Sequence, residues 1–148
     1  MIPHVGIVVC DRWTIERRIG LGGMAGVYQA RHGDERAAVK IMHTDAAANE
    51  DLVAQFATES RVMAALKHPS IPHVIETGRL DDGTPFMVME LLEGVPLDRL
   101  QRNSGGLLGV EEGLLIVDQA LGLLDYCHSH GIIHRDIKPA NLFVTSDG

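Results

Sequence analysis

The apolar and polar residues at the start of the chain alternate as they do in half-buried strands. Three such segments, 13–20, 27–31 and 37–42, are separated by a glycine cluster at 20–26 and by a second turn at 32–34. Glycine-containing turns between alternating segments are typical of antiparallel hairpins. The pattern therefore predicts an antiparallel meander of three strands.

An amphipathic helix follows the meander. Its apolar residues recur at helical spacing and are Leu52, Phe56, Met63 and Leu66. Asn49 or Asp51 is placed to cap its start. The helix should end before His68-Pro69, because the residue before a proline disfavours the helical conformation.

The pattern changes from strand to helix near the middle of the chain. Segments 71–77 and 85–92 predict two more strands, whereas segments 97–102 and 111–129 predict a short and a long helix. The first part of the chain is thus mostly strand and the rest mostly helix. This division predicts two lobes joined near Glu93-Gly94.

Composition narrows the class of protein. The chain has 148 residues, of which 45% are apolar and 22% charged, and its net charge is −7. A generic nucleic-acid binder would be basic, so no nucleic-acid partner is expected. No apolar run is long enough to span a bilayer, and the start lacks the pattern of a signal peptide. With only Cys10 and Cys127, a disulfide framework or zinc site is not indicated, and a cytoplasmic location is expected.

A glycine-rich loop is the first candidate for chemistry. Gly20-Leu21-Gly22-Gly23-Met24-Ala25 matches G-x-G-x-x-[GA], which lets backbone N–H groups approach phosphates. The same pattern fits an ordinary turn or a dinucleotide-binding turn. The dinucleotide interpretation requires a helix directly after the loop, and Gly26-Val27-Tyr28-Gln29-Ala30 is poor helix-forming sequence.

Two charged residues lie within apolar patterns, where a charge is stable only if it is exposed to solvent or has a partner. Lys40 follows Ala37-Ala38-Val39 in an apolar strand, where it is either an exposed solubilising residue or a ligand for phosphate. Glu59 shares a helical face with Phe56 and Met63. It either stays solvated or pairs with a cation such as Lys40.

Positions 134–141 read His-Arg-Asp-Ile-Lys-Pro-Ala-Asn, which is H-R-D-x-x-x-x-N. With this motif, in order after the glycine loop and Lys40, the sequence resembles the eukaryotic-type (Hanks-type) serine/threonine protein kinases, which also occur in bacteria. The resemblance implies an α+β fold. Its antiparallel five-stranded N-lobe with helix C would comprise 13–92, and a partial, mainly helical C-lobe with the catalytic loop would comprise 93–148. Residues 1–12 would be an N-terminal extension.

The resemblance also implies roles for individual residues. Asp136 would accept the proton of a protein serine or threonine hydroxyl, Lys138 would steady the γ-phosphate of ATP, and Asn141 would hold Mg²⁺. Lys40 would contact the α- and β-phosphates with Glu59 as its partner, and Met89 would be the gatekeeper beside the adenine-binding backbone. The implied nucleotide-binding residues are Ile19, Gly20, Leu21, Gly22, Gly23, Met24, Ala25, Gly26, Val27, Ala38, Lys40, Glu59, Met89, Glu90, Leu92 and Phe143.

The family's D-F-G motif does not occur in the 148 residues, whose last two are Asp147-Gly148. We therefore expect a truncated kinase domain with an incomplete Mg²⁺ site at Asn141, inactive by itself. An apolar side of the helix 111–129 should be exposed and favour self-association. A natural short module that binds nucleotide or a partner without catalysis is the alternative, and a dinucleotide-dependent oxidoreductase is disfavoured by the H-R-D motif.

Overall fold

The structure is a computed structural model that describes residues 4–135 and 137–146. The described residues form two compact units. Unit 1 comprises the residues up to Lys67 together with Ile71–Leu91, and unit 2 comprises His68–Ser70 together with the residues from Leu92 onward. Each unit is considered by itself.

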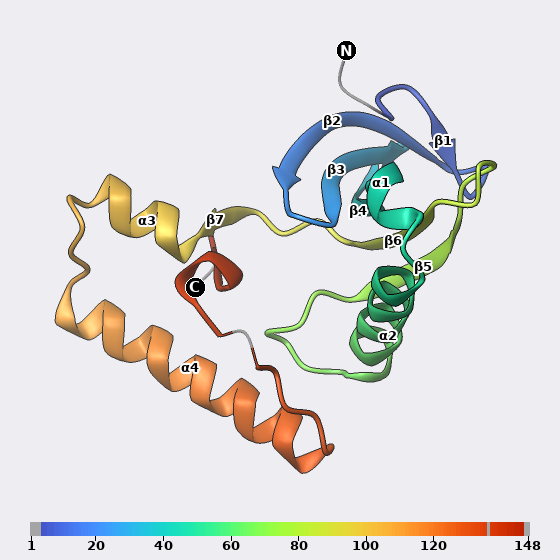
Figure 1. The fold of residues 1–148 in the computed structure, drawn as a ribbon. Coiled ribbons are helices and arrows are strands. Elements are labelled where there is room, and N and C mark those ends of the chain that lie inside the picture. Colours follow the sequence, from blue (N-terminus) through green and yellow to red (C-terminus); the bar gives the residue numbers. More distant parts are fainter. Residues whose placement is uncertain (1–3, 136, 147–148) are drawn as a thin grey trace. The chain divides into compact units, whose positions relative to one another are not determined.

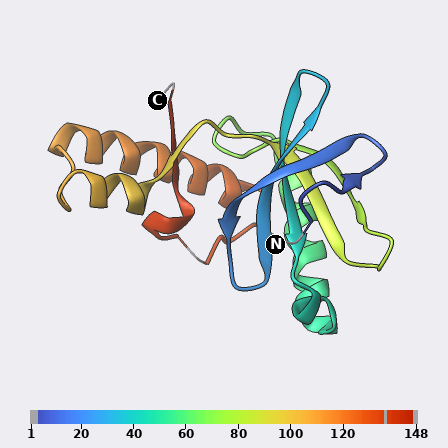
Figure 2. The ribbon, with the colours of Figure 1, turned by 90° about the horizontal axis from the view of Figure 1, so that it is seen from above.

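Unit 1 is built on a six-stranded antiparallel sheet in the order β1-β2-β3-β4-β6-β5 (Figure 1). Figure 2 shows the twist of its strands. Their bounds are β1 (Val8–Val9), β2 (Trp13–Leu21), β3 (Ala25–His32), β4 (Glu35–Met42), β5 (Val74–Arg79) and β6 (Pro85–Glu90). Two helices follow β4, namely α1 (Thr44–Ala47) and α2 (Glu50–Ala65). The five strands that the pattern predicts are all present.

Period-two alternation divides the residues of β4 and β6 between two apolar clusters. Val39 and Ile41 belong to a cluster with Trp13 and Tyr28, and all four are at most 2% exposed. Met42 and Met87, from the alternate positions, pack with Phe56 of α2 in the second cluster. Because side chains alternate along a strand, Lys40 faces the same side of the sheet as Met42, which is the side covered by α2.

The structure decides between the two residues, Asn49 and Asp51, that the sequence offered as the cap of α2. Asn49 is the N-cap, and its side-chain oxygen accepts hydrogen bonds from the N–H groups of Asp51 and Leu52 at 3.0 and 3.3 Å. The prediction that the helix ends before His68-Pro69 is confirmed, since α2 ends at Ala65. Asp51 lies in the first turn instead, where a carboxylate interacts favourably with the helix dipole.

Three features of unit 1 differ from the sequence pattern. The glycine cluster separates two strands as predicted, but the break is shorter than the cluster, because β2 continues to Leu21 and β3 already begins at Ala25. Helix α1 was not predicted, since four residues are too few for a periodic signal. The segment before β2 contributes β1, whose Val9 pairs with Trp13 and is 1% exposed.

Unit 2 contains two helices and a small sheet. Strand β7 (Gly94–Pro96) pairs antiparallel with β8 (Phe143–Thr145), and a short 3₁₀ helix η1 (Pro139–Asn141) precedes β8. Helices α3 (Leu97–Asn103) and α4 (Val110–Ser129) confirm the two predicted helices. None of the described helices is long and apolar enough to cross a membrane.

Candidate active site

Lys40 and Glu59 form a short ion pair in unit 1. Lys40 Nζ on β4 donates to Glu59 Oε1 on α2 at 2.6 Å. The Lys40 side chain is 18% exposed and that of Glu59 37%, so the pair lies at the edge of the core. The Phe56 ring covers the ammonium group at 5.7 Å. Lys40 is therefore no freely solvated strand residue, and Glu59 is no unpartnered carboxylate.

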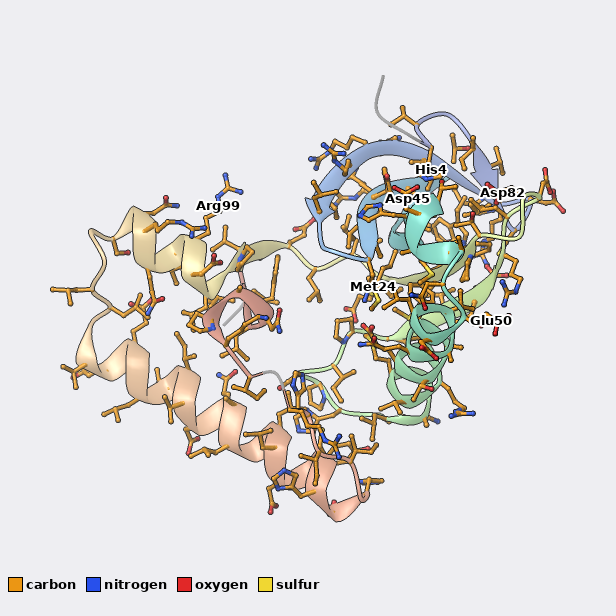
Figure 3. The ribbon with its side chains drawn as sticks, in the orientation of Figure 1. His4, Met24, Asp45, Glu50, Asp82 and Arg99 are labelled. Atoms are coloured by element: carbon orange, nitrogen blue, oxygen red, sulfur yellow. The ribbon has the colours of Figure 1, made fainter. Side chains whose placement is uncertain are left out.

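The β2–β3 hairpin is held at its tip by hydrogen bonds to the backbone. Gly22 N–H donates to the Ala25 carbonyl at 2.9 Å, which closes the turn. The His43 N–H donates to the Met24 carbonyl at 2.9 Å, and His43 Nε2 lies 2.9 Å from the Gly22 carbonyl oxygen. Met24 also packs against the second apolar cluster, which contains Met42, Met87 and Phe56 (Figure 3). Sequence reasoning missed His43, since a lone histidine after a strand carries no signal.

Among the loop glycines, Gly26 has the least space for a side chain, and none of them is needed for left-handed backbone. None of the glycines between positions 20 and 26 has a positive φ. A Cβ at Gly26 would lie 3.0 Å from the Tyr28 ring, whereas a Cβ at Gly23 would meet no atom within 4 Å. A strand follows the loop where a dinucleotide-binding turn would need a helix, so the dinucleotide interpretation is wrong.

Strand register brings several of the expected nucleotide-binding residues together. Val27 is opposite both Gly20 on β2 and Lys40 on β4, and Ala38 is opposite Met89 on β6. Ala38 is 5% exposed. The pairing therefore places the hairpin, Lys40 and the end of β6 on neighbouring strands of one sheet.

The end of β6 is fixed by Glu90. Its N–H donates to the His73 carbonyl at 2.8 Å, and its carboxylate accepts from the His73 N–H at 3.3 Å. Both bonds tie β6 to the start of β5. The Glu90 N–H is thus occupied within unit 1.

Unit 2 holds the expected catalytic-loop residues in one short segment. The Asn141 N–H donates to the Lys138 carbonyl at 2.9 Å, which forms η1, and the Leu97 N–H donates to the Leu142 carbonyl at 2.8 Å. Phe143 then enters β8 opposite Pro96. Asp136 lies outside the described residues.

Two backbone features shape this segment. Arg135 of the H-R-D motif has φ +64, a left-handed conformation that costs a non-glycine residue about 1 kcal/mol or more and is often found at functional sites. Gly94 has φ +153, and a Cβ there would collide with the Val144 carbonyl oxygen of β8. Glycine at 94 is therefore what lets β7 pair with the strand that follows the loop.

The described residues do not make a complete metal site. No group of three or more His, Cys, Asp and Glu residues among them is arranged to hold a metal ion. Asn141 offers one amide oxygen, whereas Mg²⁺ prefers an octahedron of oxygens that usually includes carboxylates and substrate phosphates. Asn141 can thus be at most one ligand of an ion that arrives with a nucleotide.

Comparison with known proteins identifies the fold. The protein kinase domain family matches residues 13–148. A relative named probable serine/threonine-protein kinase PknB, from Lactococcus lactis, is 36% identical over 98% of this chain and 23% of its own length. Serine/threonine-protein kinase PknA from Mycobacterium tuberculosis is 33% identical over 100% of this chain and 36% of its own length. The solved kinase domain of PknI from M. tuberculosis matches with a TM-score of 0.80 at 32% identity.

These matches cover most of this chain but only part of each relative. They cover nearly all of this chain, including both units, and the PknI match covers 97% of it. The chain spans only 23% and 36% of the two curated relatives and 58% of the PknI kinase-domain chain. The fold is the α+β, protein-kinase-like fold that the motifs predict. The chain therefore belongs to the protein kinase family, and its relatives are bacterial serine/threonine kinases.

Proposed function

We propose that the chain carries the ATP-binding and catalytic-loop part of a serine/threonine protein kinase. The observation that carries this proposal is the 2.6 Å contact between Lys40 and Glu59. A half-buried ammonium group beside a carboxylate on a neighbouring helix is held in place yet keeps further N–H donors. Those donors are suited to the oxygens of a phosphate chain.

The nucleotide would lie against the sheet of unit 1. The β2–β3 hairpin would cover its phosphates, and Val27 and Ala38 would contact the adenine ring together with Phe143 of unit 2. Met89 would be the gatekeeper. In this proposal residues 13–92 act as the N-lobe and 93–148 as part of the C-lobe, with a protein serine or threonine as substrate.

The catalytic loop would supply the groups that act on the transferred phosphoryl group. Asp136 would accept the proton of the substrate hydroxyl, and Lys138 would neutralise charge on the γ-phosphate. Asn141 would contribute one oxygen to Mg²⁺ bound by ATP. Because the 148 residues contain no D-F-G aspartate, we expect a polypeptide of these residues to bind ATP and to transfer phosphate very slowly or not at all.

Nucleotide titration tests the binding part of this proposal. Lys40→Met should weaken the binding of a fluorescent ATP analogue by about tenfold or more, because one charge-assisted contact to phosphate is lost. Lys67→Met removes the same charge outside the proposed site and should leave the affinity unchanged. Equal affinities of the two variants would contradict the role of Lys40.

A binding module without catalysis is the second candidate. Such a module would need only the nucleotide contacts proposed for unit 1. Transfer of labelled γ-phosphate to a basic protein substrate separates the two candidates when it is measured beside Asp136→Asn. Transfer that depends on Asp136 supports a competent kinase, whereas ATP binding with no Asp136-dependent transfer supports the module.

A further inference from the structure

His43 connects the end of β4 to the tip of the glycine hairpin. It directly follows Met42, the last residue of β4, and its carbonyl accepts from the Ala47 N–H at 2.8 Å at the start of α1. Its own N–H donates to the Met24 carbonyl, and its ring Nε2 lies 2.9 Å from the Gly22 carbonyl oxygen. One residue thus holds two carbonyl groups of the turn between β2 and β3.

These two bonds fix the direction of the peptide groups in the turn. A carbonyl oxygen can only accept a hydrogen bond, so His43 Nε2 carries the proton and donates to Gly22. In a trans peptide unit the C=O and the N–H point in opposite directions, and the described residues contain no cis peptide bond. The N–H groups of Gly23 and Ala25 share peptide units with the two held carbonyls. They therefore point away from His43.

This orientation favours an anion at the hairpin. A carbonyl oxygen carries partial negative charge and repels a phosphate, whereas a backbone N–H group attracts it. Because His43 engages both carbonyls, the turn already has its peptide groups oriented before a phosphate arrives. A turn without this support would have to order its backbone during binding, and that ordering would lower the affinity.

The tip of the hairpin is otherwise open. Leu21 is 67% exposed, and a Cβ at Gly23 would meet no atom within 4 Å. Met24 packs against the second apolar cluster, which also contains Ala46 of α1 and Phe56 of α2 (Figure 3). The packing of Met24 and the hydrogen bonds of the preceding paragraphs therefore tie the tip to the helices that follow β4.

We propose that His43 is a positioning residue for the phosphates of the bound nucleotide. Its ring holds the Gly22 carbonyl away from the phosphates and so raises the affinity for ATP relative to adenosine, which has no phosphate. His43 acts through the hairpin and does not itself contact the nucleotide. The inference rests on the proposed function, since it requires that the hairpin cover the phosphates of ATP.

Fluorescence titration with the methylanthraniloyl derivatives of ATP and of adenosine tests this role, because the two probes differ only in the triphosphate. His43→Ala removes the ring and keeps the backbone bond to Met24. It should weaken the binding of the ATP probe by about three- to tenfold, the usual effect of one hydrogen bond, and leave the binding of the adenosine probe unchanged.

Two further variants separate positioning from a general loss of stability. His43→Gln keeps an N–H donor near the position of Nε2 and should restore most of the affinity for the ATP probe. His32→Ala removes a ring whose Nδ1 lies 3.0 Å from the Arg12 carbonyl oxygen, at the other end of β3. It removes the same kind of contact far from the tip, so the binding of both probes should stay unchanged.

Lys40→Met, titrated in parallel, shows which statement fails. If it binds the ATP probe as well as the original protein does, the proposed function is wrong, and the role of His43 is wrong with it. If Lys40→Met weakens the binding of the ATP probe but His43→Ala does not, only the role of His43 is contradicted. The same holds if His43→Ala weakens the binding of both probes equally, or if His43→Gln binds the ATP probe no better than His43→Ala.

Discussion

At the scale of single residues, the structure fixes contacts that the sequence left as alternatives. Lys40 could have been a solubilising residue and Glu59 a solvated one, yet they meet at 2.6 Å because alternation along β4 turns Lys40 toward α2. Their pairing was predictable only as a candidate, since sequence spacing does not say which face of the sheet a helix will cover. The support of the glycine hairpin by His43 had no sequence signal.

Asp82 gives a prediction about pH at this scale. Its side chain accepts a hydrogen bond from the Thr84 N–H at 2.9 Å in the β5–β6 turn, and this bond lowers the pKa of the carboxyl group (Figure 3). A lowered folded-state pKa means that the charged form stabilises the fold. That contribution is present above the unfolded pKa of about 4 and is lost as the pH falls through the folded pKa.

Asp82→Asn tests this sign. The variant should be less stable than the original protein in urea unfolding at neutral pH, and the difference should shrink as the pH falls below about 4. Asp81→Asn is the matched control in the same turn. A difference that stays constant or grows toward acid pH would contradict the role of Asp82.

At the scale of elements, the strands and helices that hydrophobic periodicity predicts are present in the structure. The long strands and the helices α2, α3 and α4 all carry repeating apolar positions. Elements without a repeat were missed, including α1 with four residues and β1 with two. The glycine cluster was predicted to separate two strands, and it does, although the break is shorter than the cluster because β2 continues to Leu21 and β3 begins at Ala25.

The cap of α2 gives a prediction at this scale. Asn49→Ala should lower the free energy of unfolding by about 1 kcal/mol, because two N–H groups at the helix start lose their acceptor. Asn49→Ser keeps a capping oxygen and should recover most of the loss. Urea unfolding followed by circular dichroism measures both, and an Asn49→Ala variant as stable as the original would contradict this assignment of the cap.

At the scale of the whole molecule, the described chain forms two units whose boundary is not a single point in the sequence. His68–Ser70, just after α2, groups with unit 2 although the residues on both sides of it belong to unit 1. The His68 ring lies 4.9 Å from that of Tyr126 on α4, which gives a physical reason. Hydrophobic pattern placed the division near Glu93-Gly94 and could not reveal such a return contact.

Helix α4 has exposed apolar side chains, which leads us to expect association between copies of the polypeptide. Val110, Leu114, Val117 and Leu121 are 79%, 64%, 54% and 60% exposed, and their spacing puts them in one stripe. We therefore expect the isolated polypeptide to self-associate as its concentration rises, because burying this stripe removes apolar surface from water.

Sedimentation velocity tests this expectation. Leu114→Glu combined with Leu121→Glu should shift the population toward monomer, whereas Gln119→Glu, an exposed polar position on the same helix, should not. A monomer at every concentration, with no binding of a hydrophobic dye, would contradict the expectation.

In the proposed function, Lys40 and Glu59 act together to bind ATP. A double-mutant cycle measures it directly, with the ATP dissociation constant determined by calorimetry for the original protein, Lys40→Met, Glu59→Gln and the double variant. If Glu59 acts by holding Lys40, the effects are not additive and the coupling is about 0.5–3 kcal/mol. Additive effects, or an affinity unchanged by Lys40→Met, would contradict the claim.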